Sequence, residues 1–351
     1  GLRAELVTHD DGSVNVYARV SGRADLAGRS DRPALLISAH TDTVFPLSCD
    51  LALRRDEVNR RLFGPGIGDN SLAVAALIAI AHALAAVQPR LECDVWLVAN
   101  AAEEGLGDLR GIRAALGYLE SAHPAGVGAA VVLEGLALGT VYHRGIGVRR
   151  YRLEVECPGG HSWGDEGIPS AIHEAVALLA RMAALELPAA PRTTLNVGRI
   201  GGGTSINTIA AKAHAEIDLR GETSDAVEAI ETRVLSIARQ TERANVAVRM
   251  HPIGNRPAGG IAGDHPLVAA AEQSLAAVGI RANPRAGSTD ANAIFAAGIP
   301  CVCVGVSTGA GAHRADEYID LDPIAGGMRQ LGLLIPAAAR IAAGETGGGA
   351  A

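Results

Sequence analysis

Aromatic residues are scarce in this sequence: they make up 3% of its 351 residues, whereas 48% of the residues are hydrophobic. The core must therefore be built mainly from aliphatic side chains, in a chain long enough for two domains or one large one. Basic residues are also fewer than acidic ones, so the formal net charge is −7. With no basic run to neutralise phosphates, the composition argues against a nucleic-acid or acidic-membrane partner.

Membrane and disulfide signals are weak as well. No apolar run approaches the roughly 20 residues that span a bilayer, and the sequence shows no signal-peptide pattern. The five cysteines lack the spacing of a disulfide framework. Cys301 and Cys303 lie in an apolar run, where they are expected in a core strand rather than as a ligand pair. The odd count and apolar surroundings favour a reducing, cytoplasmic compartment.

Apolar strands alternate with helices in the first part of the chain. Strands are expected at residues 35–39, 95–99 and 129–133, with helices at residues 71–86 and 109–120. This alternation is typical of a largely parallel, doubly wound α/β sheet.

The pattern changes near Gly145. The next strand alternates apolar and polar residues, as a half-exposed strand does, and it begins the order strand–helix–strand–strand–helix–strand, which is ferredoxin-like. The α/β style resumes at residue 253. We therefore expect a doubly wound mixed sheet formed by residues 1–144 and 253–351, with an inserted α+β domain at residues 145–252.

The first core strand, Leu35–Ala39, ends directly before His40, and Asp42 follows two residues later. Ligands of open α/β sheets bind at the carboxyl ends of the strands. Side chains two apart in an extended chain point the same way, so one of the pair can bind a metal while the other orients its ring. Taken alone, such a pair is more often a simple turn after a strand.

Further acidic and imidazole side chains recur where later strands stop. Asp69 precedes a helix, Glu103 and Glu104 follow a strand, Glu134 ends one, and His313 lies in a late loop. Taken singly, they could be a helix N-cap, a solvated helix start, a turn residue and a loop histidine. Carboxylates crowded on one rim repel each other unless a cation neutralises them. Two histidines with three or four carboxylates form the ligand set of a two-metal hydrolytic site.

The residue types also limit the metal and the base. Imidazole suits zinc, cobalt or nickel better than magnesium, and one carboxylate can bridge two ions about 3.5–4 Å apart. Adjacent Glu103 and Glu104 would point to opposite sides of an extended backbone. One of them can therefore bind a metal while its neighbour acts as a general base.

With these motifs the chain resembles the co-catalytic zinc peptidases and acylases, which include glutamate carboxypeptidase, aminoacylase, succinyl-diaminopimelate desuccinylase and tripeptide aminopeptidase. The resemblance covers nearly the whole chain, and its motifs occur in order: Ser38-Ala-His40-Thr-Asp42, Gly66-Ile-Gly-Asp69, Ala102-Glu-Glu-Gly105, Leu133-Glu-Gly135, Gly159-Gly-His161-Ser, Asn207, Ile217-Asp-Leu-Arg220 and Gly311-Ala-His313. It implies a zinc-peptidase-like catalytic domain with an inserted lid or dimerisation domain, and a homodimer formed through that insertion.

The resemblance also implies a role for each expected ligand. His40 and Glu134 would hold one divalent metal ion, and Glu104 and His313 would hold a second. Asp69 would bridge both ions. Zinc is the expected metal, with cobalt or manganese as alternatives.

Other residues receive catalytic and substrate-binding roles by the same resemblance. Asp42 would orient the metal-binding histidine. Glu103 would take a proton from the metal-bridging water, which is the nucleophile, and pass it to the leaving amine. His161 would polarise the substrate carbonyl with help from Asn207, and Arg220 could bind a substrate carboxylate. The pocket would be lined by Gly202, Gly203, Ser288 and Thr289.

Two positions bear on the subfamily. The family implies a cis peptide between Asp69 and Asn70, but Asn70-Ser71-Leu72 stands where many relatives carry an acidic residue or Met followed by Lys-Gly. Glu134, rather than an aspartate, is more similar to the carboxypeptidase and deacylase branches than to the aminopeptidases. The sequence therefore predicts a dinuclear-metal hydrolase, carboxypeptidase- or deacylase-like, that cleaves an amide bond in small peptides or N-acyl amino acids.

Three alternatives are open. A tripeptide-type aminopeptidase could use the same scaffold, and a catalytically inactive binding protein would be expected to lack a ligand or Glu103, whereas every position is filled. A nucleotide-binding oxidoreductase is disfavoured because Gly64-x-Gly66-x-Gly68 lacks the full Gly-x-Gly-x-x-Gly spacing and does not directly follow a strand. No Gly-Lys-Ser/Thr follows the glycines at positions 201–203 either.

Overall fold

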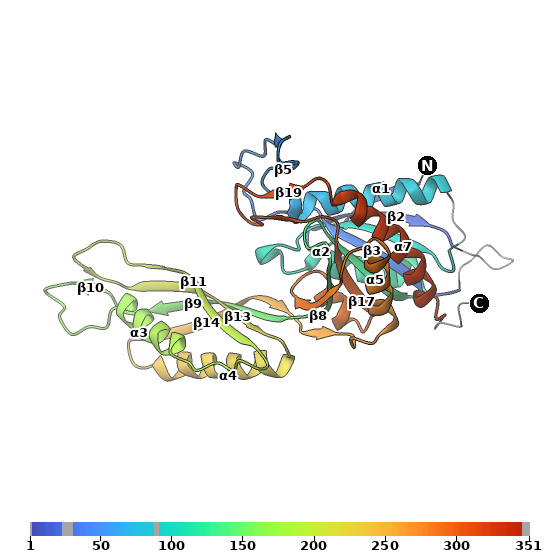
Figure 1. Ribbon diagram of the computed structural model, residues 1–351. Coiled ribbons are helices and arrows are strands. Elements are labelled where there is room, and N and C mark those ends of the chain that lie inside the picture. The colour runs from blue at the N-terminus through green and yellow to red at the C-terminus, as the bar shows by residue number, and fades with distance from the viewer. Residues whose placement is uncertain (1, 23–30, 88–90, 346–351) are drawn as a thin grey trace. The chain divides into compact units, whose positions relative to one another are not determined.

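The computed structural model describes residues 2–22, 31–87 and 91–345 (Figure 1). It divides the chain into two compact units, Gly1–Gly145 with Gly260–Ala351, and Ile146–Gly259. The sequence analysis placed the end of the insertion at residue 252. That residue lies inside strand β14 (Ala247–Arg256), so the structural boundary falls later because the strand is longer than its apolar pattern suggests.

A mixed sheet, nine-stranded in the described residues, forms the centre of the first unit. Its strand order is β1-β2-β6-β3-β7-β17-β8-β15, with β16 paired to β8. The β6, β3, β7 and β17 strands run parallel to one another, whereas β2 is antiparallel to β6 and β17 is antiparallel to β8. The strands are β1 (Ala4–Thr8), β2 (Val14–Val20), β3 (Ala34–His40), β6 (Val95–Asn100), β7 (Val127–Glu134), β8 (Thr140–Gly145), β15 (Gly259–Gly260), β16 (Asn283–Gly287) and β17 (Cys301–Gly305).

Helices cover both faces of this sheet, which explains why β3 is buried along its whole length. Leu35 and Ile37 face a large aliphatic cluster, whereas Leu36 faces a second cluster that includes Trp96. The first cluster is closed by α1 (Leu72–Val87), α5 (Pro266–Ala277) and α7 (Ile324–Ala342), and the second by α2 (Arg110–Ala122) and α6 (Ala291–Ala296). Cys301 and Cys303 are fully buried in β17, as expected.

One helix is more apolar than the sequence analysis allowed. The segment Ile67–Ala86, with a mean hydropathy of 1.6, is long and apolar enough to cross a membrane, and 39% of its most apolar window is buried inside the protein. Ala73, Leu77 and Ile80 on this helix pack into the aliphatic cluster of the sheet. A core helix of this kind passes the same test of length and composition, so the segment is weak evidence for a membrane span.

A small sheet beside the main one was not predicted. Its order is β18-β19-β5-β4, and Tyr318 pairs with Phe63 across β19 and β5. This pairing joins the segment before Asp69 to the segment after His313. The four strands are β4 (Arg54–Asp56), β5 (Arg61–Phe63), β18 (Gly309–Ala310) and β19 (Tyr318–Asp320).

The second unit has the expected ferredoxin-like arrangement. Its antiparallel sheet has the order β11-β13-β9-β14, and its two helices pack on one sheet face to form a separate core (Figure 1). The first and last strands are neighbours, because Val148 pairs with Arg256. The elements are β9 (Gly147–Glu156), α3 (Ala171–Ala183), β11 (Thr193–Gly202), β13 (Lys212–Gly221), α4 (Ser224–Thr241) and β14, with β10 (Gly160–His161) and β12 (Thr208–Ile209) forming a separate two-stranded ribbon.

Candidate metal centre

His40 is the last residue of β3 and is 1% exposed. Its Nδ1 donates to the backbone carbonyl of Asp42 at 3.0 Å, whereas the Asp42 carboxylate lies 3.6 Å from the same nitrogen. In the neutral ring, Nδ1 carries the proton of this bond and Nε2 offers its lone pair to a cation. The ring is therefore oriented mainly by the main chain of Asp42.

Asp69 lies between the two histidines of the first unit's expected ligand set. It belongs to η1 (Ile67–Ser71), which leads into α1, and its peptide bond to Asn70 is cis. Its Oδ1 lies 3.2 Å from Nε2 of His40, and its Oδ2 lies 3.1 Å from Nε2 of His313. Each carboxylate oxygen thus faces a different imidazole, which is the geometry of a bridging ligand.

Two groups of possible ligands share Asp69. His40, Asp69 and Glu134 form the first, and Asp69, Glu104 and His313 form the second, with the ligand atoms of each group within 4.8 Å of one another. Oε2 of Glu134 lies 3.8 Å from Nε2 of His40, and Oε1 of Glu104 lies 3.1 Å from Nε2 of His313. These are the two sets that the resemblance implied.

The crowded carboxylates have displaced pKa values. Burial, followed by the charges of Asp69 and Glu103, raises the pKa of Glu104 to about 7. Burial and the same two neighbours raise the pKa of Glu134 well above its ordinary value. Burial alone would lower the pKa of His40, but hydrogen bonds to carboxylates raise it well above its ordinary value. Bound protons thus provide the charge balance that cations would otherwise supply, so this donor set fits a pair of divalent ions.

Glu103 and Glu104 follow a backbone turn in which Ala102 has a positive φ of 59°. The Asp42 carboxylate accepts both of their backbone N–H groups, from Glu103 at 3.0 Å and from Glu104 at 2.9 Å. The Glu104 side chain then reaches His313, whereas the Glu103 side chain, 6% exposed, lies near His40 and Glu104. Asp42 therefore fixes the backbone of both glutamates, a role that the sequence analysis did not assign.

In the second unit, the ribbon of β10 and β12 brings His161 and Asn207 together. His161 pairs with Thr208, and the backbone N–H of Ser162 donates to the carbonyl of Asn207 at 3.1 Å. Nδ1 of His161 accepts the N–H groups of Trp163 and Gly164, each at 3.2 Å. The neutral ring therefore carries its proton on Nε2, which is free to donate from an exposed loop.

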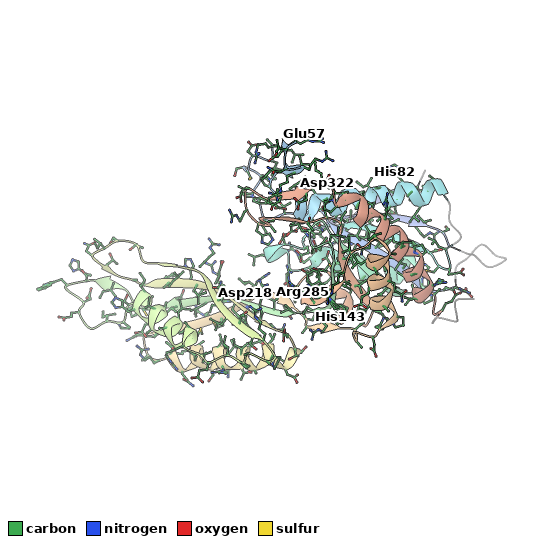
Figure 2. The ribbon with its side chains drawn as sticks, in the orientation of Figure 1. Glu57, His82, His143, Asp218, Arg285 and Asp322 are labelled. Atoms are coloured by element: carbon green, nitrogen blue, oxygen red, sulfur yellow. The ribbon has the colours of Figure 1, made fainter. Side chains whose placement is uncertain are left out.

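Arg220 is engaged in an ion pair in this structure. Its Nε donates to Asp218 at 2.7 Å, and Asp218 (Figure 2) also accepts from Arg150 at 3.0 Å. This supports a solvated strand-end role, and substrate binding by Arg220 stays a prediction. Gly202 closes the end of β11, where a Cβ would lie 2.7 Å from the Lys212 carbonyl.

The other expected pocket residues belong to backbone turns. Gly203 follows β11 with a φ of 74°. Ser288 precedes Thr289, whose hydroxyl accepts the backbone N–H of Ala291 at 3.2 Å at the start of α6. The Thr289 hydroxyl thus bonds to the first residue of α6, whose N-cap is Asp290. The lining of a pocket by Gly202, Gly203, Ser288 and Thr289 stays a prediction.

Two buried residues that hold the candidate centre together were missed. The Asn70 side chain donates to the Leu133 carbonyl at 3.0 Å and accepts the Gly135 N–H at 2.7 Å, which ties the Asp69 loop to the end of β7. The Glu317 carboxylate, fully buried, accepts three N–H groups of the same loop. The signals in the sequence were the polar residue after Asp69 and the acidic residue shortly after His313.

A mixed sheet with an inserted ferredoxin-like unit, and carboxylate–imidazole groups at its strand ends, define the class of metal-dependent hydrolases. The sequence profile of Peptidase family M20/M25/M40 matches residues 36–336, and the chain belongs to this family. The matched family is one of metal-dependent peptidases.

Curated relatives that match the chain are named probable carboxypeptidases. A probable carboxypeptidase from Aspergillus fumigatus is 29% identical over 245 residues, which cover 62% of this chain and 53% of the relative. A probable carboxypeptidase from Aspergillus terreus is 28% identical over 221 residues, which cover 60% of this chain and 48% of the relative. The chain spans about half the length of the curated relatives it matches.

Solved structures confirm the expected fold class. A tripeptidase from Staphylococcus aureus matches with a TM-score of 0.77 at 18% identity, covering 97% of this chain and 89% of that chain. The di-peptidase Dug1p from Saccharomyces cerevisiae matches with a TM-score of 0.71 at 14% identity, covering 93% and 83%. A dinuclear metal binding peptidase of the M20 family from Bacillus subtilis matches with a TM-score of 0.62 at 19% identity, covering 95% and 87%.

Proposed function

We propose that this enzyme is a dinuclear-metal hydrolase that cleaves the amide bond of small peptides or N-acyl amino acids in a carboxypeptidase- or deacylase-like manner. The observation that carries the proposal is the Asp69 carboxylate, whose two oxygens lie 3.2 Å and 3.1 Å from different imidazole nitrogens. A carboxylate so placed can hold two cations at once.

The ligand sets follow from the two groups around Asp69. His40 and Glu134 would hold one ion with Asp69, and Glu104 and His313 would hold the other. Zinc suits this mixture of imidazole and carboxylate, and cobalt or manganese could replace it. When bound, such a pair polarises the scissile carbonyl and makes a water molecule acidic enough to attack near neutral pH.

Glu103 is the proposed general base. Its backbone is fixed by Asp42, and its side chain lies beside Glu104 and His40 without belonging to either set that shares Asp69. It would take the proton of the attacking water and deliver it to the leaving amine.

His161 is the proposed donor to the carbonyl oxygen on which negative charge develops. Two backbone donors on Nδ1 leave the proton on Nε2, which suits this role without protonation of the ring. Asn207, held beside it by the β10–β12 ribbon, would assist. A homodimer formed through the inserted unit, in a reducing cytoplasm that suits five free cysteines, belongs to this proposal.

The end of the peptide that is attacked distinguishes the leading proposal from its rival. The curated relatives are named probable carboxypeptidases, whereas two solved structures of this fold are named a tripeptidase and an aminopeptidase. The relatives' names and Glu134 favour release from the carboxyl end.

A metal-reconstituted substrate screen tests this proposal. Protein stripped with a chelator is reloaded with Zn²⁺, Co²⁺ or Mn²⁺ and incubated with a tripeptide of three different residues, blocked and unblocked dipeptides, and N-acyl amino acids. Mass spectrometry of the products is expected to show metal-dependent release of the carboxyl-terminal residue or of the acyl group. Release of the amino-terminal residue would establish the aminopeptidase, and no hydrolysis under any metal would overturn the enzyme assignment of these residues.

A further inference from the structure

Glu317 is a fully buried carboxylate with no role in the chemistry proposed above. Its Oε1 accepts the backbone N–H groups of Gly68 and Asp69, each at 2.7 Å, and its Oε2 accepts that of Gly66 at 3.1 Å. An ionised carboxylate is costly to bury unless such donors replace its water. Hydrogen bonds to a charged acceptor are about twice as strong as neutral ones, so these three bonds hold the loop firmly.

The glycines of this loop make room for the carboxylate. Gly66 has a φ of 70°, which favours glycine, and a Cβ at Gly68 would lie 3.0 Å from Oε1 of Glu317 and 2.7 Å from the Leu136 side chain. Successive N–H groups in such a turn form a concave anion site. The Gly64-x-Gly66-x-Gly68 pattern, which the sequence analysis disfavoured as a nucleotide loop, therefore binds an anion that the chain itself supplies.

Glu317 also belongs to the segment that carries His313. Its backbone N–H donates to the backbone carbonyl of Arg314 at 3.1 Å within that turn, and its own backbone carbonyl accepts the N–H of Gly64 at 2.9 Å. One residue thus bonds, through side chain and main chain, the two loops whose Asp69 and His313 side chains face each other at 3.1 Å.

We propose that Glu317 is a positioning residue: its carboxylate fixes Asp69 opposite His313 and thereby sets the affinity of the cation site that these two share with Glu104. The inference rests on the proposed function, because it assumes that this group binds a metal. Residues that orient metal ligands typically change metal affinity by about 10–100-fold when removed.

The test is a Co²⁺ titration of chelator-stripped protein. Calorimetry measures the affinity, and the visible absorption of the bound ion reports its ligand geometry. Glu317→Ala is expected to bind one of two Co²⁺ ions about 10–100-fold more weakly, with an altered absorption spectrum. Glu317→Gln keeps one oxygen for the Gly68 and Asp69 donors and is expected to recover most of the affinity. At saturating Co²⁺ the turnover of both variants should return to within several-fold of wild type, because Glu103 is untouched.

Asp94→Ala is the matched control. Asp94 is 5% exposed and accepts the Gly22 N–H at 3.0 Å, but it precedes β6, at the opposite end of the strand from the candidate centre. It should lower the melting temperature without changing Co²⁺ affinity. If Glu317→Ala does not fold, Glu317→Asp takes its place: its shorter side chain draws the carboxylate away from the three N–H donors and is expected to weaken the binding of the same ion, and wild-type affinity in that variant would overturn the inference.

The failures are distinguishable. Wild-type protein that binds no Co²⁺ pair would overturn the proposed function and this inference with it. Wild-type protein that binds two ions, while both Glu317 variants bind them with wild-type affinity and spectrum, would overturn this inference alone.

Discussion

At the scale of single residues, Glu103 and Glu104 show how neighbours in the chain receive different tasks. Both N–H groups bond to the Asp42 carboxylate, yet only the Glu104 side chain lies 3.1 Å from His313. The Glu103 side chain lies near His40 instead, and its ligand atom is still within 4.8 Å of that of Glu104. The two carboxylates therefore converge, and do not point to opposite sides as they would in a regular extended chain.

Glu103→Ala should therefore separate catalysis from metal binding. We expect hydrolysis to fall by about 10²–10⁴-fold, the usual contribution of a general base, while metal analysis still finds two ions per chain. Glu57→Ala, at an exposed glutamate in the turn between β4 and β5 (Figure 2), is the control and should keep full activity. Turnover of Glu103→Ala equal to wild type would remove it from the mechanism.

The displaced pKa of Glu104 predicts a pH dependence of stability in the metal-free protein. The folded pKa of about 7 lies above the ordinary value of 4.5, so between these values the folded state holds a proton that the unfolded chain releases. The contribution of Glu104 to the free energy of unfolding should fall as the pH rises from about 4.5 to 7 and then level off. Glu134, whose pKa is also raised, acts in the same direction.

Metal should reverse this trend, because protons compete with cations for the same oxygens. Thermal unfolding between pH 5.5 and 8, with chelator or with Zn²⁺, measures it: added Zn²⁺ should stabilise the protein more at pH 8 than at pH 5.5. In Glu104→Gln the trend without metal should weaken. An identical trend in that variant would contradict the assignment to Glu104.

Much of this residue set could be predicted, because ligands such as His40 and Glu134 directly end recognisable apolar strands. Glu317 could not, because its partners are backbone N–H groups of a loop distant in sequence, and no side-chain pattern indicates where backbone donors converge. The ion pair of Arg220 with Asp218 could not be predicted for a related reason. Two charged residues on the same side of a strand can bond to each other or to a ligand, and which of these occurs depends on what covers that side of the sheet.

At the scale of elements, the end of β7 and the loop before α1 approach unusually closely. A Cβ on Gly135 would lie 2.1 Å from the carbonyl oxygen of Gly68, and the Gly135 N–H bonds to Asn70. Only a residue without a side chain lets the two segments meet, which brings Glu134 beside Asp69.

Gly135→Ala should force these segments apart. We expect a loss of about 1–3 kcal/mol in the free energy of unfolding from overpacking, together with weaker metal binding, measured by denaturant unfolding and by Zn²⁺ titration. Gly332→Ala in α7 meets open space and should instead stabilise the protein by about 0.5–1 kcal/mol. Unchanged metal affinity in Gly135→Ala would show that the close approach does not position the ligands.

Long elements were predictable because burial gives them a continuous apolar run, as in β3, or an apolar periodicity, as in α4. The short strands β4, β5, β18 and β19 were not. Arg54-Arg55-Asp56 carries no apolar pattern. The sheet forms because two local strand pairs, β4–β5 and β18–β19, meet through the pairing of β5 with β19, which are distant in sequence. The end of β14 was missed because Pro252 and Gly254 interrupt its strand-like composition. Its last residues nevertheless pair with β9.

At the scale of the whole molecule, the two chain segments that connect the inserted unit to the catalytic sheet lie next to each other within each unit. Val148 pairs with Arg256, and the Ile261 N–H donates to the His143 carbonyl at 3.0 Å in the first unit. Each unit also has its own core. The insertion should therefore be removable without disrupting the catalytic sheet.

A chain in which residue 145 is joined to residue 260 by a short Gly-Ser linker should fold and bind two ions but lose hydrolysis, because it lacks His161. Residues 146–259 alone should unfold cooperatively. Circular dichroism, metal analysis and the substrate screen measure these outcomes. Full activity of the shortened chain would show that the inserted unit contributes nothing to catalysis.

The scarcity of indole rings has a practical consequence. The chain has two tryptophans: Trp96, 8% exposed in the first unit, and Trp163, 88% exposed in the second. The backbone N–H of Trp163 donates to Nδ1 of the His161 ring. Intrinsic fluorescence therefore has two separable sources, a shielded blue-shifted emitter that follows the sheet and a quenchable red-shifted emitter beside the proposed carbonyl donor. Ligand docking at His161 can be followed in real time without any attached dye.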